Sequence, residues 1–177
     1  MPFCQFSIYS YIPQTIKDER EVIRIPTESM LAQFADINEN LKKQSITKDI
    51  ALNSLLEENE KRVHLPMIDF DTDNPERVKR VIPLMQKYDI PEALIFSSGR
   101  SFHLYGLSLL GEEQWQKFMG DCILLNHELI GEEYHRIQTI DDRWIGHSLI
   151  RGYSALRISS NQPNYLNEPI LQFRLKA

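Results

Sequence analysis

Three aspartates follow an apolar stretch in the segment LPMIDFDTDNPE, residues 65–76. In a strand over 66–71, Ile68 and Phe70 would face one side of the sheet, and Asp69 and Asp71 would face the other. Two carboxylates two residues apart on one face can share a divalent cation such as Mg²⁺ or Mn²⁺. From the residues alone, three interpretations are open: a metal site, a phosphoryl nucleophile, or a solvated turn from strand to helix.

A second stretch, SFHLYGLSL at 101–109, alternates in the same way. Ser101, His103 and Tyr105 would point to one face of a strand, and the apolar residues between them to the other. A tight turn, Ser97 to Arg100, separates this stretch from ALIFS at 93–97, which indicates a β-hairpin. If the two polar strands lie in one sheet, the serine and the histidine share a face with the aspartates.

The elements that would position these residues follow from apolar spacing and from turn residues. A cap at Asp73 or Asn74, with Pro75 at the first helical position, predicts the helix after the aspartates. From the first aspartate strand onward, the order β-α-β-β-α predicts an α+β fold with an RRM-like, split β-α-β sheet. We expect one domain over 1–177, with an N-terminal αβ layer at 1–62 and the RRM-like unit at 63–177. The expected strands are 3–12, 64–71, 93–97, 101–109, 154–158 and 169–175, and the expected helices are 27–43, 47–61, 75–88, 112–126 and 144–151, with a polar loop before the last helix.

Composition limits the classes of protein that the chain can represent. The 177 residues are 42% hydrophobic and 25% charged, as in ordinary globular domains. The N-terminus lacks the features of a signal peptide, and no apolar run is long enough to span a membrane. Two cysteines, Cys4 and Cys122, fit a reducing compartment and are too few for a Cys-rich zinc site. We therefore expect a cytoplasmic protein without a membrane partner.

Charge is unevenly distributed along the chain. The net charge of −5 disfavours a protein that coats nucleic acid by electrostatics alone. Residues 101–142 carry eight acidic and two basic side chains, whereas 143–177 carry five basic side chains and one acidic one, Glu168. The basic segment is either a solvated surface or a place where phosphates bind. Its cationic residues are Arg143, Arg151, Arg157, Arg174 and Lys176.

Three motifs resemble those of the archaeo-eukaryotic primase superfamily, which includes primase-polymerases and the polymerase domains of bacterial end-joining ligases. They are MIDFD at 67–71, SSGRSFHLYG at 97–106 and DDRWIGHSLIRGYSALRIS at 141–159. In that superfamily a DxD or DxE lies on the first strand of an RRM-like unit, an SxH follows on the hairpin, and a later aspartate completes the metal site. The resemblance covers about residues 64–160, and it implies nucleotide transfer in DNA replication or repair.

Carried over residue by residue, the resemblance implies that Asp69 and Asp71 are metal ligands for Mg²⁺ or Mn²⁺. The third ligand would be Asp142 or its neighbour Asp141, with Asp142 favoured. The phosphates of a nucleoside triphosphate would lie against the turn that follows the first hairpin strand and against the next strand. The residues implied there are Ser98, Gly99, Arg100, Ser101 and His103, with Arg157 near the nucleotide or the template.

The implied partners are a nucleoside triphosphate and a DNA or RNA template and primer. Because the chain is acidic overall, a helicase or another protein could supply the grip on the template. Two other interpretations compete. A haloacid-dehalogenase-like phosphatase would use Asp69 as its nucleophile, although SFHLYGLSL reads as a strand where that fold has a helix. A non-catalytic RRM-like module would bind nucleic acid through exposed aromatic residues.

Overall fold

The structure is a computed structural model that describes residues 2–12, 15–58, 61–130, 132–163 and 167–177. Its larger sheet is antiparallel and six-stranded, in the order β2-β1-β3-β4-β8, with β11 paired to β3. Chain segments from both halves of the protein therefore build this sheet. Its strands are β1 (Phe3–Tyr9), β2 (Arg20–Pro26), β3 (Asp49–Glu58), β4 (Lys61–His64), β8 (Leu110–Gly111) and β11 (Ala155–Arg157).

The second sheet is antiparallel and four-stranded, in the order β12-β6-β7-β5. Directly paired residues of antiparallel strands lie on the same face of a sheet. Ile68, Leu104 and Ile95 are paired in this way and are buried against the helices. The opposite face, which carries Asp69 and His103, is free to form a site. The strands are β5 (Met67–Asp69), β6 (Glu92–Ser97), β7 (Phe102–Gly106) and β12 (Ile170–Lys176).

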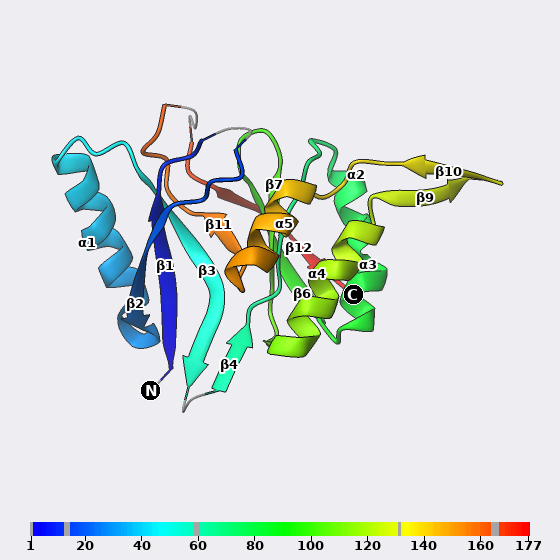
Figure 1. Ribbon diagram of the computed structural model, residues 1–177, viewed down its shortest axis with the longest axis horizontal. Coiled ribbons are helices and arrows are strands. Elements are labelled where there is room, and N and C mark those ends of the chain that lie inside the picture. The colour runs from blue at the N-terminus through cyan, green and yellow to red at the C-terminus, as the bar shows by residue number, and fades with distance from the viewer. Residues whose placement is uncertain (1, 13–14, 59–60, 131, 164–166) are drawn as a thin grey trace.

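The helices flank the two sheets on opposite sides of the molecule (Figure 1). Helix α1 (Met30–Lys43), preceded by a 3₁₀ turn at Thr27–Ser29, packs on the larger sheet. The smaller sheet is covered by α4 (Glu112–Leu124) and by the segment after β5. That segment comprises α2 (Pro75–Val78), a 3₁₀ turn at Lys79–Val81 and α3 (Ile82–Lys87), and α5 (Asp142–Arg151) lies between the two groups in Figure 1.

The structure confirms an α+β protein with mainly antiparallel sheets, and most of the predicted elements form. The expected helix 75–88 is interrupted by a 3₁₀ turn at Lys79–Val81, one turn before Pro83, because a proline within a helix removes a backbone donor. Asn74, rather than Asp73, caps it by accepting a hydrogen bond of 2.9 Å from the Glu76 backbone N–H. The RRM-like detail and the division at residue 62 stay predictions.

The expected helix 47–61 is wrong, because residues 49–58 form β3, the strand at the centre of the larger sheet. β3 pairs with β1 along one edge and with β4 and β11 along the other. Residues on both of its faces are buried, among them Ile50, Ala51 and Leu55. A strand buried on both faces has a nearly continuous apolar run, and such a run does not distinguish a strand from a helix. Strand β2 was not predicted either.

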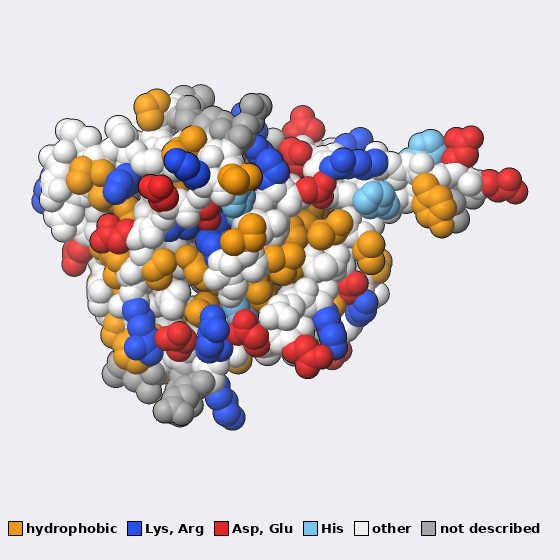
Figure 2. Space-filling model, viewed as in Figure 1, with side chains coloured by type: hydrophobic (Ala, Val, Ile, Leu, Met, Phe, Trp, Pro, Cys, Tyr) orange, Lys and Arg blue, Asp and Glu red, His pale blue; other side chains and the backbone are white. Residues whose placement is uncertain are grey.

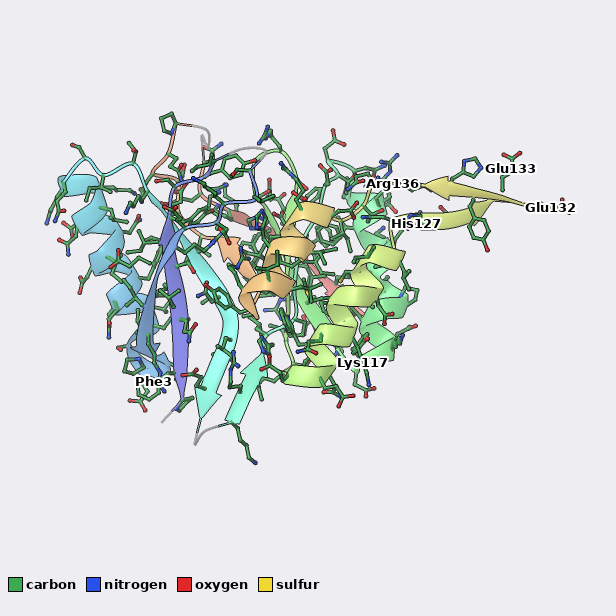
Figure 3. The ribbon with its side chains drawn as sticks, viewed as in Figure 1. Phe3, Lys117, His127, Glu132, Glu133 and Arg136 are labelled. Carbon is green, nitrogen blue, oxygen red and sulfur yellow. The ribbon has the colours of Figure 1, made fainter. Side chains whose placement is uncertain are left out.

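The expected polar loop before α5 is instead a β-hairpin, formed by β9 (His127–Ile130) and β10 (Glu133–Arg136). The hairpin projects from the body of the protein, and Glu132 and Glu133 lie near its tip (Figure 3). Acidic and histidine side chains gather on it (Figure 2). Two ion pairs hold its base, Arg80 with Glu128 at 2.6 Å and Arg136 with Asp142. No helix of the described ranges is both long enough and apolar enough to cross a membrane.

Candidate active site

The two strands with alternating polar residues are neighbours in the smaller sheet. Asp69 on β5 is directly paired with His103 on β7, so the two side chains share a face. Their closest polar atoms, Asp69 Oδ1 and His103 Nε2, are 3.6 Å apart, which is too long for a hydrogen bond. The alternation that was read from the sequence therefore brings a carboxylate and an imidazole together.

A third carboxylate reaches this face through an isolated β-bridge between Phe70 and Ile140. The Asp71 backbone N–H donates to Thr139 O at 2.9 Å, and the Asp141 backbone N–H donates to Asp69 O at 3.0 Å. In an antiparallel bridge the residues that flank the paired residues lie on the same face. Asp69, Asp71 and Asp141 therefore share a face, and all three line one cavity.

The structure does not bring Asp142 to this cavity, whereas it brings Asp141 there. Asp142 accepts a hydrogen bond of 2.5 Å from Asn126 Nδ2 and forms an ion pair with Arg136 at the base of the hairpin. Asp141 is the N-cap of α5, and its Oδ1 accepts hydrogen bonds from the backbone N–H groups of Arg143 and Trp144, at 2.8 and 3.2 Å. The cap fixes which of the two adjacent aspartates faces the cavity.

The three carboxylates affect one another electrostatically. Burial raises the pKa of Asp69 well above its usual range, and the charges of Asp141 and Asp71 raise it further. Among the described residues, no group of three His, Cys, Asp or Glu side chains is already gathered closely enough to hold a metal ion. Neighbouring carboxylates repel each other without a cation, and a hard divalent cation prefers oxygen ligands of this kind. The carboxylate oxygens of the cavity thus have the donor chemistry that Mg²⁺ or Mn²⁺ prefers.

His103 is a buried, neutral imidazole. Its side chain is 5% exposed, and burial together with the nearby charge of Arg157 lowers its pKa to about 3. Its Nδ1 is buried and has no hydrogen-bond partner among the described residues. Buried polar atoms are nearly always hydrogen-bonded, so the Nδ1 of His103, unpaired within the described part of the chain, is an exception.

The Ser101 hydroxyl contacts the backbone around Asp71. It donates to Phe70 O and lies 3.1 Å from Thr72 O, and the Thr72 backbone N–H points to it at 3.3 Å. These contacts hold the backbone on both sides of Asp71. Ser101 lines the cavity, as the resemblance implied, and its hydroxyl also positions a carboxylate.

The turn before β7 is held by a buried arginine. Arg157 is 4% exposed, and its Nη2 donates to Ser98 O at 2.8 Å. Its Nη1 donates to Asn167 O at 3.2 Å and to Ser159 O. Within the turn, the Ser98 backbone N–H donates to Ser101 O at 2.9 Å, and Gly99 has a φ of +108°, which favours glycine. Ser98, Arg100 and Arg157 line the cavity, and Gly99 does not.

The cavity has a volume of ≈ 800 Å³, and residues of both sheets and of α5 form its walls. Five arginines and three aspartates line it, so cationic groups surround the acidic cluster. The charge asymmetry of the sequence indicated three of these arginines, and the SSGR motif indicated Arg100. Sequence reasoning missed Arg20, because no motif surrounds it. The five are Arg20, Arg100, Arg143, Arg151 and Arg157.

Comparison with known protein families identifies a match over most of the chain. A family model described as archaeo-eukaryotic primase 1D-like, or AEP-like, matches residues 29–170. The matched range includes all three aspartates of the cavity, His103 and Arg157. No curated protein and no solved structure matches the chain.

Proposed function

The chain belongs to the archaeo-eukaryotic primase-like family, and from this premise we propose that it is a metal-dependent nucleotidyltransferase of the primase-polymerase type. In the proposed reaction a 3′-hydroxyl attacks the α-phosphorus of a nucleoside triphosphate, and pyrophosphate leaves. The observation that carries the proposal is the convergence of Asp69, Asp71 and Asp141 in a cavity that five arginines also line.

We propose that Asp69, Asp71 and Asp141 hold Mg²⁺ or Mn²⁺, which when bound supplies positive charge for the attacking and leaving oxygens. Asp141 replaces Asp142 in this assignment because only Asp141 lines the cavity. The capping bonds of Asp141 reach its Oδ1 and set the direction of the carboxylate. Ser101 fixes the backbone beside Asp71, so the protein contributes a fixed arrangement of oxygens.

The remaining cavity residues suit the triphosphate. A neutral His103 carries one ring N–H, which can donate to a phosphate oxygen. Arg100 offers a guanidinium group, which pairs with phosphate through two parallel hydrogen bonds. Arg157 acts differently in this proposal: it holds the turn that presents Arg100 and the strand that presents His103.

Calorimetric titration of the pure protein with ATP and with dATP, with and without Mn²⁺, tests the proposal. Asp141→Asn is the informative variant, because asparagine keeps the helix cap and removes the charge. Asp142→Asn is its matched control on the same helix. We expect metal-dependent nucleotide binding in the wild type and in the control, and its loss in Asp141→Asn and Asp69→Asn. Primer extension should follow the same pattern.

Two results would redirect the assignment. Loss of binding in Asp142→Asn with retention in Asp141→Asn would reverse the choice of the third ligand. Wild-type protein that binds no nucleotide with any metal would contradict the proposed reaction and favour a non-catalytic module. The phosphatase alternative is weaker, because residues 102–106 form strand β7, where that fold requires a helix.

A further inference from the structure

The cavity has a second cationic group besides Arg100 and Arg157. Asp18 forms two ion pairs. Its Oδ1 lies 2.6 Å from Arg20 Nε, and its Oδ2 pairs with Arg151 Nη1. The side chains of Arg20, Arg151 and Asp18 are only 13%, 10% and 17% exposed. We call these three residues the arginine pair site.

This site carries more positive charge than its single carboxylate neutralises. Within the described part of the chain, the buried Arg20 Nη1 and Arg151 Nε have no hydrogen-bond partner. Burial lowers the pKa of Arg151, and the charge of Arg20 lowers it further. Burying an uncompensated charge is costly, and a fold keeps one where a bound counter-charge offsets the cost.

The arginine pair site is well ordered by its surroundings. The Arg20 guanidinium lies 4.1 Å from the centre of the Tyr9 ring, and Arg151 also donates to Ser148 Oγ at 3.3 Å. Asp18 anchors both arginines, so neither has to lose much side-chain freedom when an anion arrives. Preorganised guanidinium groups are suited to phosphate, whose oxygens accept paired hydrogen bonds.

The arginine pair site and the acidic cluster come from different parts of the chain and from opposite ends of α5. Asp18 and Arg20 precede the range that the family model matches, which begins at residue 29. Arg151 lies in the last turn of α5, whereas Asp141 caps the start of the same helix. Asp18 and Arg20, from outside the matched range, therefore join Arg151 of α5 in a cavity whose acidic residues lie within that range.

We infer that Arg20 and Arg151 form a second phosphate-binding site in the cavity, distinct from the one beside the three aspartates. The inference deepens the proposed function, on which the nature of the ligand rests. The phosphate belongs either to a nucleic-acid strand that enters the cavity or to the triphosphate of the incoming nucleotide. Both sources present the same chemistry to the two guanidinium groups.

The test compares Arg20→Met, which removes the charge and keeps an apolar stem, with Arg24→Met. Arg24 lies on the same strand, is 55% exposed, pairs with Glu57 and does not line the cavity. A fluorescent single-stranded oligonucleotide, with and without a 5′-phosphate, and ATP are titrated separately in EDTA over a range of salt concentrations. Thermal melts establish that each variant is folded.

We expect Arg20→Met to weaken binding of one probe about tenfold or more and Arg24→Met to leave it nearly unchanged. A weaker oligonucleotide complex, with a salt slope reduced by about 1, assigns the phosphate to a strand. If only the 5′-phosphorylated probe is affected, the phosphate is terminal. A weaker ATP complex with an unchanged oligonucleotide complex assigns it to the nucleotide. Equal effects of the two variants, or no binding of either probe by the wild type, overturn the inference.

Asp18→Asn provides a second variant in case Arg20→Met does not fold. It keeps both guanidinium groups and one acceptor oxygen that can hold them, and it removes their neutralising charge, so the affected probe should bind more tightly, most strongly at low salt. Unchanged or weaker binding by folded Asp18→Asn contradicts the inference. Because these titrations contain EDTA, they do not depend on metal at the acidic cluster. Absence of metal-dependent nucleotide binding would count against the proposed function and leave the second phosphate site standing.

Discussion

Replacing Arg157 by methionine should destabilise the protein strongly, although the residue lines the cavity. The guanidinium group donates to three backbone carbonyls, those of Ser98, Ser159 and Asn167. Methionine fills a similar volume and donates no hydrogen bond, so these three carbonyls would lose the buried guanidinium group as their partner. The turn before β7 and the segments after β11 would lose their common anchor.

The size of the effect follows from the number of bonds. Hydrogen bonds to a charged group contribute roughly 1.5 kcal/mol each at the low end, which gives about 4.5 kcal/mol for the three. For a domain of this length, 1 kcal/mol shifts the melting temperature by roughly 2–4 °C. We therefore expect Arg157→Met to melt about 9–18 °C below the wild type.

Urea denaturation followed by circular dichroism measures the free energy of unfolding directly. Arg174→Met is the matched control, because Arg174 is 66% exposed and forms only a surface ion pair with Glu92, at 3.3 Å. We expect its free energy of unfolding to change by less than about 0.5 kcal/mol. Arg157→Lys should fall between the two, since a lysine keeps the charge and reaches fewer carbonyls. A loss below about 1 kcal/mol in Arg157→Met would refute the anchoring role.

Three further predictions concern single residues of the site and the core. Because burial and the charges of Asp141 and Asp71 raise the pKa of Asp69 in the folded protein, its ionisation opposes folding. Asp69→Asn should match the metal-free wild type in stability below about pH 4 and exceed it by about 1 kcal/mol at pH 7. Urea denaturation at each pH measures the difference, and equal stability at every pH would contradict this expectation. Ser101→Ala should cost about 1–2 kcal/mol and weaken Mn²⁺-dependent ATP binding, measured by denaturation and calorimetry, whereas unchanged binding would remove its positioning role. Burial raises the pKa of the Cys122 thiol, so iodoacetamide should label Cys122 only in denaturant, and rapid labelling of native protein would contradict its burial.

The sequence was sufficient to predict that the first aspartates and the hairpin histidine share a face if their strands lie in one sheet, and the structure shows that the two strands are paired. Period-2 alternation places Asp69 and His103 on defined faces, and the short turn between β6 and β7 makes those strands neighbours. No local pattern could select Asp141 over Asp142. That choice depends on which residue caps α5 and on the contacts that Asn126 and Arg136 make with the other.

Tertiary context accounts for the remaining differences between the sequence predictions and the structure. β3 lies at the centre of the larger sheet, and burial of both its faces removes the alternation by which a strand is recognised. Arg20 enters the cavity because Asp18 pairs it with Arg151, a residue far away in the sequence. A contact of that kind leaves no periodic or spacing signal in the chain.

The bridge between Phe70 and Ile140 has a consequence for the order of folding. It joins residues separated by a large part of the chain, and closing so long a loop costs entropy that only later contacts recover. The hairpin of β6 and β7 can form locally, whereas the third carboxylate joins the others only when α5 docks. We therefore expect the acidic cluster to be complete only in the fully folded chain, so that a nascent or partly unfolded molecule carries its aspartates without a working site.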